Sequence, residues 1–320
     1  MTEPAADACL ACGASEFRTL FSATDRLYRT TDKYFEIVEC LTCRLLRLYP
    51  RPTPAALRTY YPPDYWFMPG DSLPERMEER YRRFVLADHV AFVSRALEDA
   101  AEEGPVLDVG CGGGLFLRML KEQGYPVTGL DFSHKAAAVA WSAKAVPCVA
   151  ADLASAPFRA ASCAAVTMFH VLEHLTDPAA YLNAAHALLR PGGRLIVQVP
   201  NAACWQFLLL GENWTGIDVP RHLINFRARD LEALVEACGF EVLRRKHFSL
   251  RDNPAGLATS MAPWLDPMAR RIRGLSEGTA LKLFKDALYF GLVVASVPFT
   301  ALEACCRAGS TIMIEARKKP

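Results

Sequence analysis

The 320-residue sequence has almost no net charge, because 36 lysines and arginines face 35 aspartates and glutamates. A formal charge of +1 disfavours a broadly basic nucleic-acid-binding protein. The chain also lacks the composition of a disordered, collagen-like or coiled-coil protein, since 52% of its residues are apolar and 22% are charged. Its length fits one large domain or two smaller ones.

The sequence shows no secretory signal, because MTEPAADACLACG contains neither a basic segment nor an apolar one. We therefore expect a cytoplasmic protein, in which cysteines are usually thiols or metal ligands. The uncharged run at 287–302 is 16 residues long, fewer than the roughly 20 that a spanning helix needs. We expect a buried or oligomer-facing helix there, and a peripheral membrane contact through 281–306 is the alternative.

Eleven cysteines are too few for a disulfide scaffold, and an odd number cannot all pair. Four of them form two C-x-x-C motifs separated by 27 residues: Cys9, Cys12, Cys40 and Cys43. Two such motifs are typical of a closed tetrahedral site for structural zinc, which predicts a zinc ribbon over 1–52. The alternatives are four unrelated buried thiols and a redox motif. Residues 1–60 carry eight basic and seven acidic residues, a poor surface for RNA.

The middle of the chain alternates short apolar runs with helical patterns. Strands are predicted at 105–110, 125–131, 146–152, 162–170 and 193–200, with helices at 114–124, from 133, and at 177–190. This order predicts a doubly wound parallel α/β sheet that binds its ligand at the carboxyl ends of the strands. Prolines between 50 and 74 indicate a linker with a short helix near 54–60, followed by a helical cap that extends to 104.

A glycine-rich loop follows the first core strand and contains Asp108, Gly110, Cys111, Gly112 and Gly114. Glycines there let the backbone approach a ligand closely. Leu115 occupies the last glycine position of the dinucleotide fingerprint, which argues against a nicotinamide oxidoreductase.

Two further acids end the next strands. Asp131 suits ribose hydroxyls, and Asp152 suits the adenine amino group, with Phe132 and Leu153 as apolar faces for the ring. For either acid the alternative is an ordinary cap or loop aspartate.

The segments VLDVGCGGGLFL, GLDFS, AADL and FHVLEHLTDP resemble the motifs of class I S-adenosylmethionine-dependent methyltransferases over about 74–248. The resemblance implies a Rossmann-like seven-stranded sheet and S-adenosylmethionine as the cofactor. It implies that Gly110 and Gly112 lie along the methionine part of the cofactor and that Asp131 binds the ribose. Asp152 with Leu153 would frame the adenine, and His170 would lie near the cofactor.

The segment PRHLINF resembles a methyltransferase subgroup with an N-terminal cysteine ribbon, which includes sugar C-methyltransferases. In that subgroup two histidines face the substrate, and the matching positions here are His222 and His174. Arg221 stands where the sugar enzymes have an acid, and we do not expect a counterpart of their further C-terminal domain. We expect His222 either to act as a base or to hold its segment against the sheet as a structural residue. We expect His174 either to contact the substrate or to cap the helix that begins at Glu173 and His174.

Three tyrosines between the ribbon and the core, Tyr60, Tyr61 and Tyr65, would line the pocket or pack at the interface. The last strands are predicted at 241–248 and 309–320, with the core over 105–248 and a helical insertion over 249–308. The sequence thus predicts a methyltransferase that acts on a small molecule, a sugar or a secondary metabolite. The rivals are an RNA methyltransferase that holds RNA with its ribbon and a cofactor-binding module without catalysis.

Overall fold

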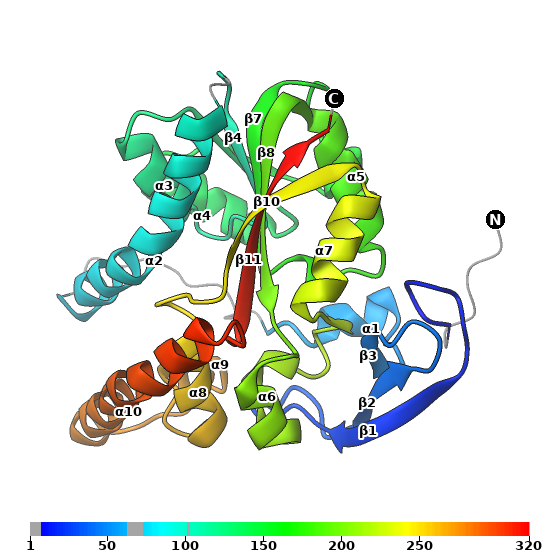
Figure 1. Cartoon of the computed structure of the whole chain (residues 1–320). Helices are drawn as coiled ribbons and strands as arrows, with labels where there is room; N and C mark the ends of the chain where they lie inside the picture. Colours follow the sequence, from blue (N-terminus) through cyan, green and yellow to red (C-terminus); the bar gives the residue numbers. More distant parts are fainter. Residues whose placement is uncertain (1–7, 63–72, 101–102, 320) are drawn as a thin grey trace.

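The computed structural model describes residues 8–62, 73–100 and 103–319. Tyr65, named above as a pocket candidate, lies outside the described residues. Two sheets organise the chain, a larger one in the core and a smaller one near the N-terminus (Figure 1).

The larger sheet has seven strands in the order β10-β11-β8-β7-β4-β5-β6. They are β4 (Val106–Val109), β5 (Val127–Asp131), β6 (Cys148–Ala150), β7 (Cys163–Phe169), β8 (Leu189–Pro200), β10 (Phe240–Lys246) and β11 (Thr311–Lys318). The strands from β4 to β8 are parallel, and β11 runs antiparallel to both β8 and β10. The predicted fold class is confirmed. The predicted start of the fifth strand was late, because Leu189 already pairs with Cys163 across an irregularity in the register.

Helices cover both faces of this sheet (Figure 1). One face carries α2 (Leu73–Ala100), α3 (Leu115–Glu122) and α4 (His134–Lys144), and the other carries α5 (Pro178–Leu188) and α7 (Ala228–Ala237). In α3 the apolar side chains recur at helical spacing, so that Phe116, Leu117 and Leu120 are buried against the sheet. Ser133 caps α4 as predicted, because its hydroxyl accepts the amide of Ala136.

The smaller sheet combines the N-terminal region with a distant segment. It consists of β1 (Phe17–Ala23), β2 (Phe35–Cys40), β3 (Leu46–Tyr49) and β9 (Ile224–Asn225), all antiparallel to their neighbours. The short helix α1 (Pro54–Thr59) follows it, at the predicted place. Ile37 and Leu48 belong to the same apolar cluster as Val197 and Leu231 of the core. The small sheet therefore packs as an extension of the core.

The remaining helices lie at the carboxyl end of the parallel strands, toward which the β8 arrow points in Figure 1. They are α6 (Trp205–Leu210), α8 (Asn253–Met261), α9 (Pro267–Ile272) and α10 (Thr279–Cys305), and two short 3-10 turns follow α6. By length and composition α10 is apolar enough to cross a membrane, and 22% of its most apolar window is buried. This layer and the small sheet both lie at the ligand-binding end of the fold.

Candidate functional site

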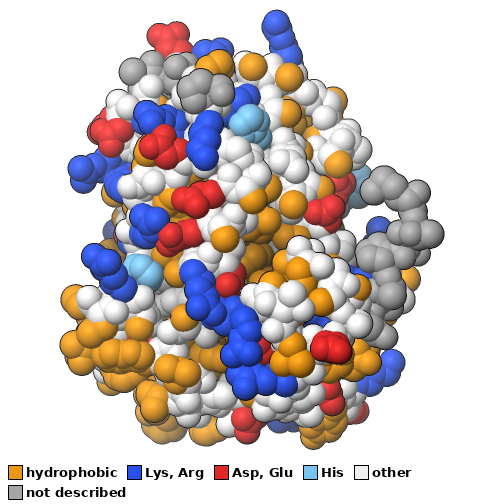
Figure 2. Space-filling view, turned by 45° about the vertical axis from the view of Figure 1, so that its right-hand side comes forward, with side chains coloured by type: hydrophobic (Ala, Val, Ile, Leu, Met, Phe, Trp, Pro, Cys, Tyr) orange, Lys and Arg blue, Asp and Glu red, His pale blue; other side chains and the backbone are white. Residues whose placement is uncertain are grey.

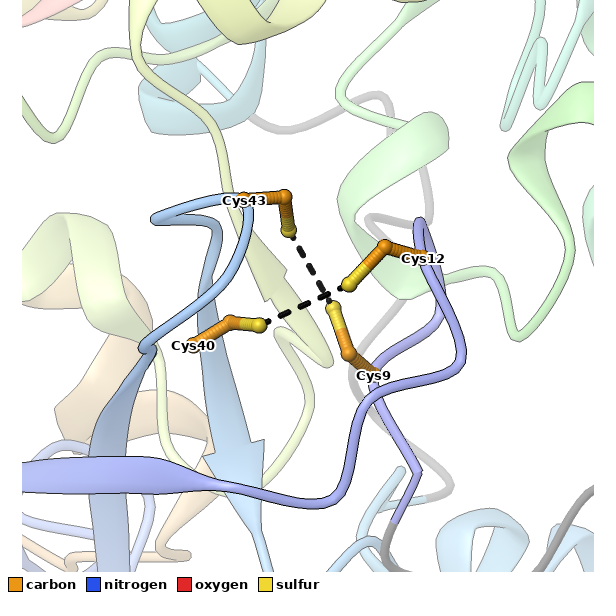
Figure 3. Close-up of side chains that lie close together, drawn as sticks. All are labelled: Cys9, Cys12, Cys40 and Cys43. Atoms are coloured by element: carbon orange, nitrogen blue, oxygen red, sulfur yellow. Dashed lines mark hydrogen bonds between the residues drawn. The ribbon is translucent and has the colours of Figure 1, made fainter.

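Four cysteines of the N-terminal region converge on one point (Figure 3). The sulfur atoms of Cys9 and Cys43 lie 3.5 Å apart, and those of Cys12 and Cys40 lie 3.6 Å apart. All four sulfurs lie within 4.8 Å of one another. Tetrahedral zinc with bonds of about 2.3 Å would separate its sulfur ligands by about 3.8 Å, so the spacing fits that ion.

Both C-x-x-C turns have the same backbone geometry. The amide of Gly13 donates to the carbonyl of Cys9, and the amide of Arg44 donates in the same way to Cys40. Gly13 and Arg44 both have left-handed backbones, with φ of 73° and 67°. Two turns of one geometry bring two pairs of thiols together without a disulfide, which suits a sulfur-only metal site.

Metal analysis should find about one zinc ion per chain. Cys40→Ser should lose it, because three sulfurs no longer close the tetrahedral shell. Cys238→Ser is the matched control, since its thiol is half-buried against α5 and far from this cluster in sequence. A wild-type chain without zinc, or a Cys40→Ser variant with full occupancy, would contradict the prediction.

The glycine-rich loop lies between β4 and α3, as predicted. Gly110, Gly112 and Gly114 have positive φ angles of 75°, 52° and 74°, which residues other than glycine rarely adopt. A Cβ atom on Gly110 would come within 2.8 Å of Val171, whereas one on Gly112 would meet no atom within 4 Å. The loop is therefore packed at Gly110 and open beside Gly112.

Asp131 ties this loop to the end of β5. Its carboxylate accepts the amide of Gly112 at 2.9 Å and the amide of Ser133 at 2.8 Å. Burial raises the pKa of Asp131, although these two amides oppose the rise. Asp108 is also buried, and burial raises its pKa to about 7 while a 2.6 Å hydrogen bond from Thr167 counteracts the rise. The carboxyl groups of Asp108 and Asp131 thus lie near the ends of β4 and β5, next to the loop.

Cys111 faces away from the open side of the loop and toward β6. Its sulfur lies 3.3 Å from the sulfur of Cys148. Gly129 of β5 makes room for the pair, because a Cβ there would lie 2.6 Å from the Cys111 sulfur. The side chain therefore has a packing reason, while its backbone remains part of the predicted cofactor loop.

The predicted adenine residues differ in exposure. Asp152 is exposed and caps a 3-10 turn, η1 (Leu153–Ser155), by accepting the amide of Ala154 at 2.9 Å. The hydroxyl of Tyr181 also donates to Asp152. Leu153 is 4% exposed, whereas Phe132 is 64% exposed. Of the two apolar candidates, Phe132 is thus the one with surface to offer a ligand.

His170 lies at the end of β7 in a network of carboxylates. Its Nδ1 is 3.2 Å from Glu173, and its Nε2 is 3.5 Å from Asp252, the residue before α8. Burial opposes protonation, but the charges of Asp252 and Glu173 raise the pKa of His170 to about 9. The two carboxylates therefore favour the protonated form of His170, which makes it a poor candidate for the base.

His174 and His222 face each other, with ring centres 4.6 Å apart. The Nδ1 of His222 donates to the carbonyl of Gly216 at 2.8 Å, and that of His174 donates to the carbonyl of Arg221 at 3.1 Å. Carbonyl oxygens only accept, so both rings carry their proton on Nδ1 and leave Nε2 as a base. Burial, and repulsion from His222 whenever that ring is protonated, lower the pKa of His174 to about 4.

The helix-cap interpretation of His174 is wrong. His174 ends a 3-10 turn, η2 (Leu172–His174), and helix α5 is capped instead by Asp177, whose carboxylate accepts the amide of Ala180. The cap preference of aspartate and Pro178 at the first helical position determine where the helix begins.

Arg221 holds the His222 segment against the ribbon. Its guanidinium is fully buried and bonds Asp25 of the ribbon at 3.0 Å and Asp218 at 2.7 Å. Burial disfavours this charge, yet Asp218 and Asp25 hold the pKa of Arg221 above its ordinary value. Tyr60 packs its buried ring against Phe35, while the hydroxyl of Tyr61 lies 3.0 Å from Nδ1 of His174. Of these two tyrosines, Tyr61 reaches the histidines.

Sequence reasoning missed two acids of the site, Glu173 and Asp252. Glu173 is 1% exposed and touches His170, and it lies 4.0 Å from Nε2 of His222. The tripeptide Leu172-Glu173-His174 offered a signal, because a glutamate next to apolar residues needs a buried partner. Asp252 offered none, since only the folded chain brings the start of α8 to β7.

With this geometry established, comparison with known proteins identifies the class. A family model described as a methyltransferase domain matches residues 76–245. The chain therefore belongs to this methyltransferase family, and the family indicated by the sequence motifs is confirmed.

Its relatives cover only part of its length. Ubiquinone biosynthesis O-methyltransferase of Xylella fastidiosa is 38% identical over 116 residues, 32% of this chain and 45% of the relative. The enzyme of that name from Pseudomonas aeruginosa is 31% identical over 149 residues, 43% and 64% of the two chains. The chain thus spans about half the length of these relatives. A solved methyltransferase from Archaeoglobus fulgidus is 18% identical, covering 77% of this chain and all of that one, with a TM-score of 0.48.

Proposed function

We propose that this protein transfers a methyl group from S-adenosylmethionine to a hydroxyl group of a small molecule, such as a sugar or another secondary metabolite. The observation that carries the proposal is the hydrogen bond from the Gly112 amide to Asp131, which joins the glycine loop to the end of the next strand. The names of the relatives in Xylella and Pseudomonas support oxygen as the acceptor atom.

The chain offers groups that fit this cofactor. The loop around Gly112 has open space beside its backbone, and Asp131 keeps lone pairs free beyond the two amides that it accepts. Asp131 would hold the ribose hydroxyls, Asp152 and Phe132 would contact the adenine, and the backbone at Gly110 and Gly112 would lie along the methionine part. When bound, S-adenosylmethionine supplies the methyl group from its positively charged sulfonium.

His222 is the proposed base for the acceptor hydroxyl. The Gly216 carbonyl fixes its tautomer, so that Nε2 can take the proton that the acceptor loses. His174 is not the proposed base because its pKa is held at about 4, far from the neutral range that favours proton transfer. Tyr61 and the Arg221 carbonyl orient His174, which we propose as a contact for the acceptor.

The rival RNA function is disfavoured by the charges of the ribbon. Arg18 and Arg44 both pair with Glu39, and Arg227 lies 3.6 Å from the same carboxylate. Arg47 is 3% exposed. Residues 1–60 as a whole carry eight basic and seven acidic residues, and this near-neutral balance gives little positive surface to follow a phosphate backbone.

The proposal is tested first by cofactor affinity. Asp131→Ala should weaken the binding of S-adenosylhomocysteine about 100-fold in calorimetry, because it removes a charged acceptor for two ribose hydroxyls at about 1.5 kcal/mol each. Asp177→Ala, which also removes an aspartate that accepts backbone amides, should leave the affinity unchanged.

An Asp131→Ala affinity within about twofold of the wild type would remove the ribose assignment. Methyl transfer to a panel of hydroxylated acceptors, followed with labelled methyl donor, tests the reaction itself. Tight cofactor binding without transfer to any acceptor would favour a non-catalytic module, and a salt-sensitive RNA complex would favour the RNA rival.

A further inference from the structure

Helix α10 turns its polar face inward and its apolar face outward, the opposite of a helix on the surface of a water-soluble protein. Its inward face carries polar groups that bond to the body of the protein or to the helix itself. The Tyr289 hydroxyl lies 2.8 Å from that of Thr259, Glu303 accepts two bonds from Gln206, and Asp286 pairs with Arg270. Thr300 and Ser296 on the same face bond carbonyls of the preceding turn.

The outward face of α10 is apolar and exposed. Its large side chains are between 49% and 64% exposed: Leu281, Leu283, Phe284, Leu288, Phe290, Val294 and Leu302. Surface helices normally place polar residues toward water and apolar ones inward. An exposed apolar patch of this kind marks an interaction surface.

Neighbouring elements enlarge this apolar surface. Trp264 and Met261, near the end of α8, are 59% and 53% exposed. Tyr81 of α2 packs edge-on against Phe290 with ring centres 6.3 Å apart. Figure 2 shows hydrophobic side chains gathered at the lower end of the molecule, with lysine and arginine side chains beside them. The surface therefore combines an apolar area with basic edges.

Two exposed basic residues flank α10. Lys282 lies in its first turn and Arg307 lies just beyond its end, and both are exposed. Arg271 is 40% exposed but lies 3.9 Å from Glu78 of α2, which is 45% exposed. All four acids between 262 and 308 are either buried or paired with a basic side chain: Asp266, Glu277, Asp286 and Glu303. This surface complements a negatively charged partner.

We propose that α10 lies on the surface of an anionic lipid bilayer, with its apolar face among the acyl chains and its basic neighbours at the phosphates. Apolar side chains with flanking lysines and arginines are the features that such interfacial helices share. The proposal does not rest on the proposed methyl transfer.

Two other occupants fit less well. A spanning helix would expose the polar groups of Tyr289, Asp286 and Glu303 to lipid and break their bonds to the body. A second copy of this chain, related by a twofold axis, would bring the same basic edges together, and like charges repel.

Sedimentation with vesicles tests the proposal. The full chain should bind vesicles of phosphatidylglycerol mixed with phosphatidylcholine, and more weakly those of phosphatidylcholine alone. Phe284→Asp combined with Leu288→Asp should reduce binding about tenfold or more, because two carboxylates enter the lipid contact. Trp141→Asp combined with Tyr34→Asp is the matched control, since these side chains are 65% and 72% exposed on other elements.

Lys282→Glu with Arg307→Glu should weaken only the phosphatidylglycerol component of binding, and thermal unfolding of every variant verifies its fold. Equal binding to both kinds of vesicle, or binding that the aspartate variant retains, would overturn the proposal. Concentration-dependent dimers that this variant abolishes, without vesicle binding by the wild type, would overturn it in favour of a second copy.

Discussion

His222→Ala should lower the turnover number about 100- to 10,000-fold, the range that general-base catalysis contributes. The physical reason is the loss of Nε2, whose lone pair is free because Nδ1 donates to the Gly216 carbonyl. The binding of S-adenosylhomocysteine should stay within about twofold of the wild type, since the predicted cofactor residues lie on other strands. Steady-state kinetics with an accepted substrate, together with calorimetry, measures both effects.

A second histidine provides the control. His186 lies in the last turn of α5 and packs its ring against Phe240, with ring centres 5.2 Å apart. His186→Ala should keep the turnover. Full activity in His222→Ala would show that His222 has only a structural role in its segment. Loss of turnover in His174→Ala alone would assign the role of the base to His174.

Arg221→Met should reduce the free energy of unfolding by about 3–5 kcal/mol, the cost of leaving a buried charge without its partner. Asp25 and Asp218 would both lose their guanidinium partner, and their side chains are only 1% and 13% exposed. Denaturant unfolding followed by circular dichroism measures the change.

Arg245→Met is the matched control for this loss. Arg245 also makes two hydrogen bonds to one carboxylate, that of Glu232, but its side chain is 43% exposed. An exposed pair contributes about 1 kcal/mol or less. Equal losses of unfolding free energy in the two variants would show that burial does not increase the contribution of the Arg221 ion pairs to stability.

The core and the cysteine cluster were predictable because each depends on a local pattern. Alternating apolar runs and helical periods determine a parallel sheet, and two C-x-x-C spacings bring four thiols together. The chain order of Asp108, Asp131 and Asp152 along successive strands placed all three at one edge of the sheet.

Other parts depend on contacts between distant segments, and these could not be read from a pattern. The pairing of β9 with β3 involves only Ile224 and Asn225, too few residues for any periodicity. Arg221 was noted for replacing an acid, but its partner Asp25 is 196 positions away. The approach of Asp252 to His170 likewise follows from how the insertion packs.

The shared sheet of β3 and β9 has a consequence for how such enzymes diversify. His222 is two residues before a strand whose only sheet partner among the described residues is β3 of the ribbon. A substitution at Leu46 or Arg47 would therefore act on the strand that directly follows the proposed base. Acceptor selectivity can thus evolve through the N-terminal region without any change among the residues that line the site.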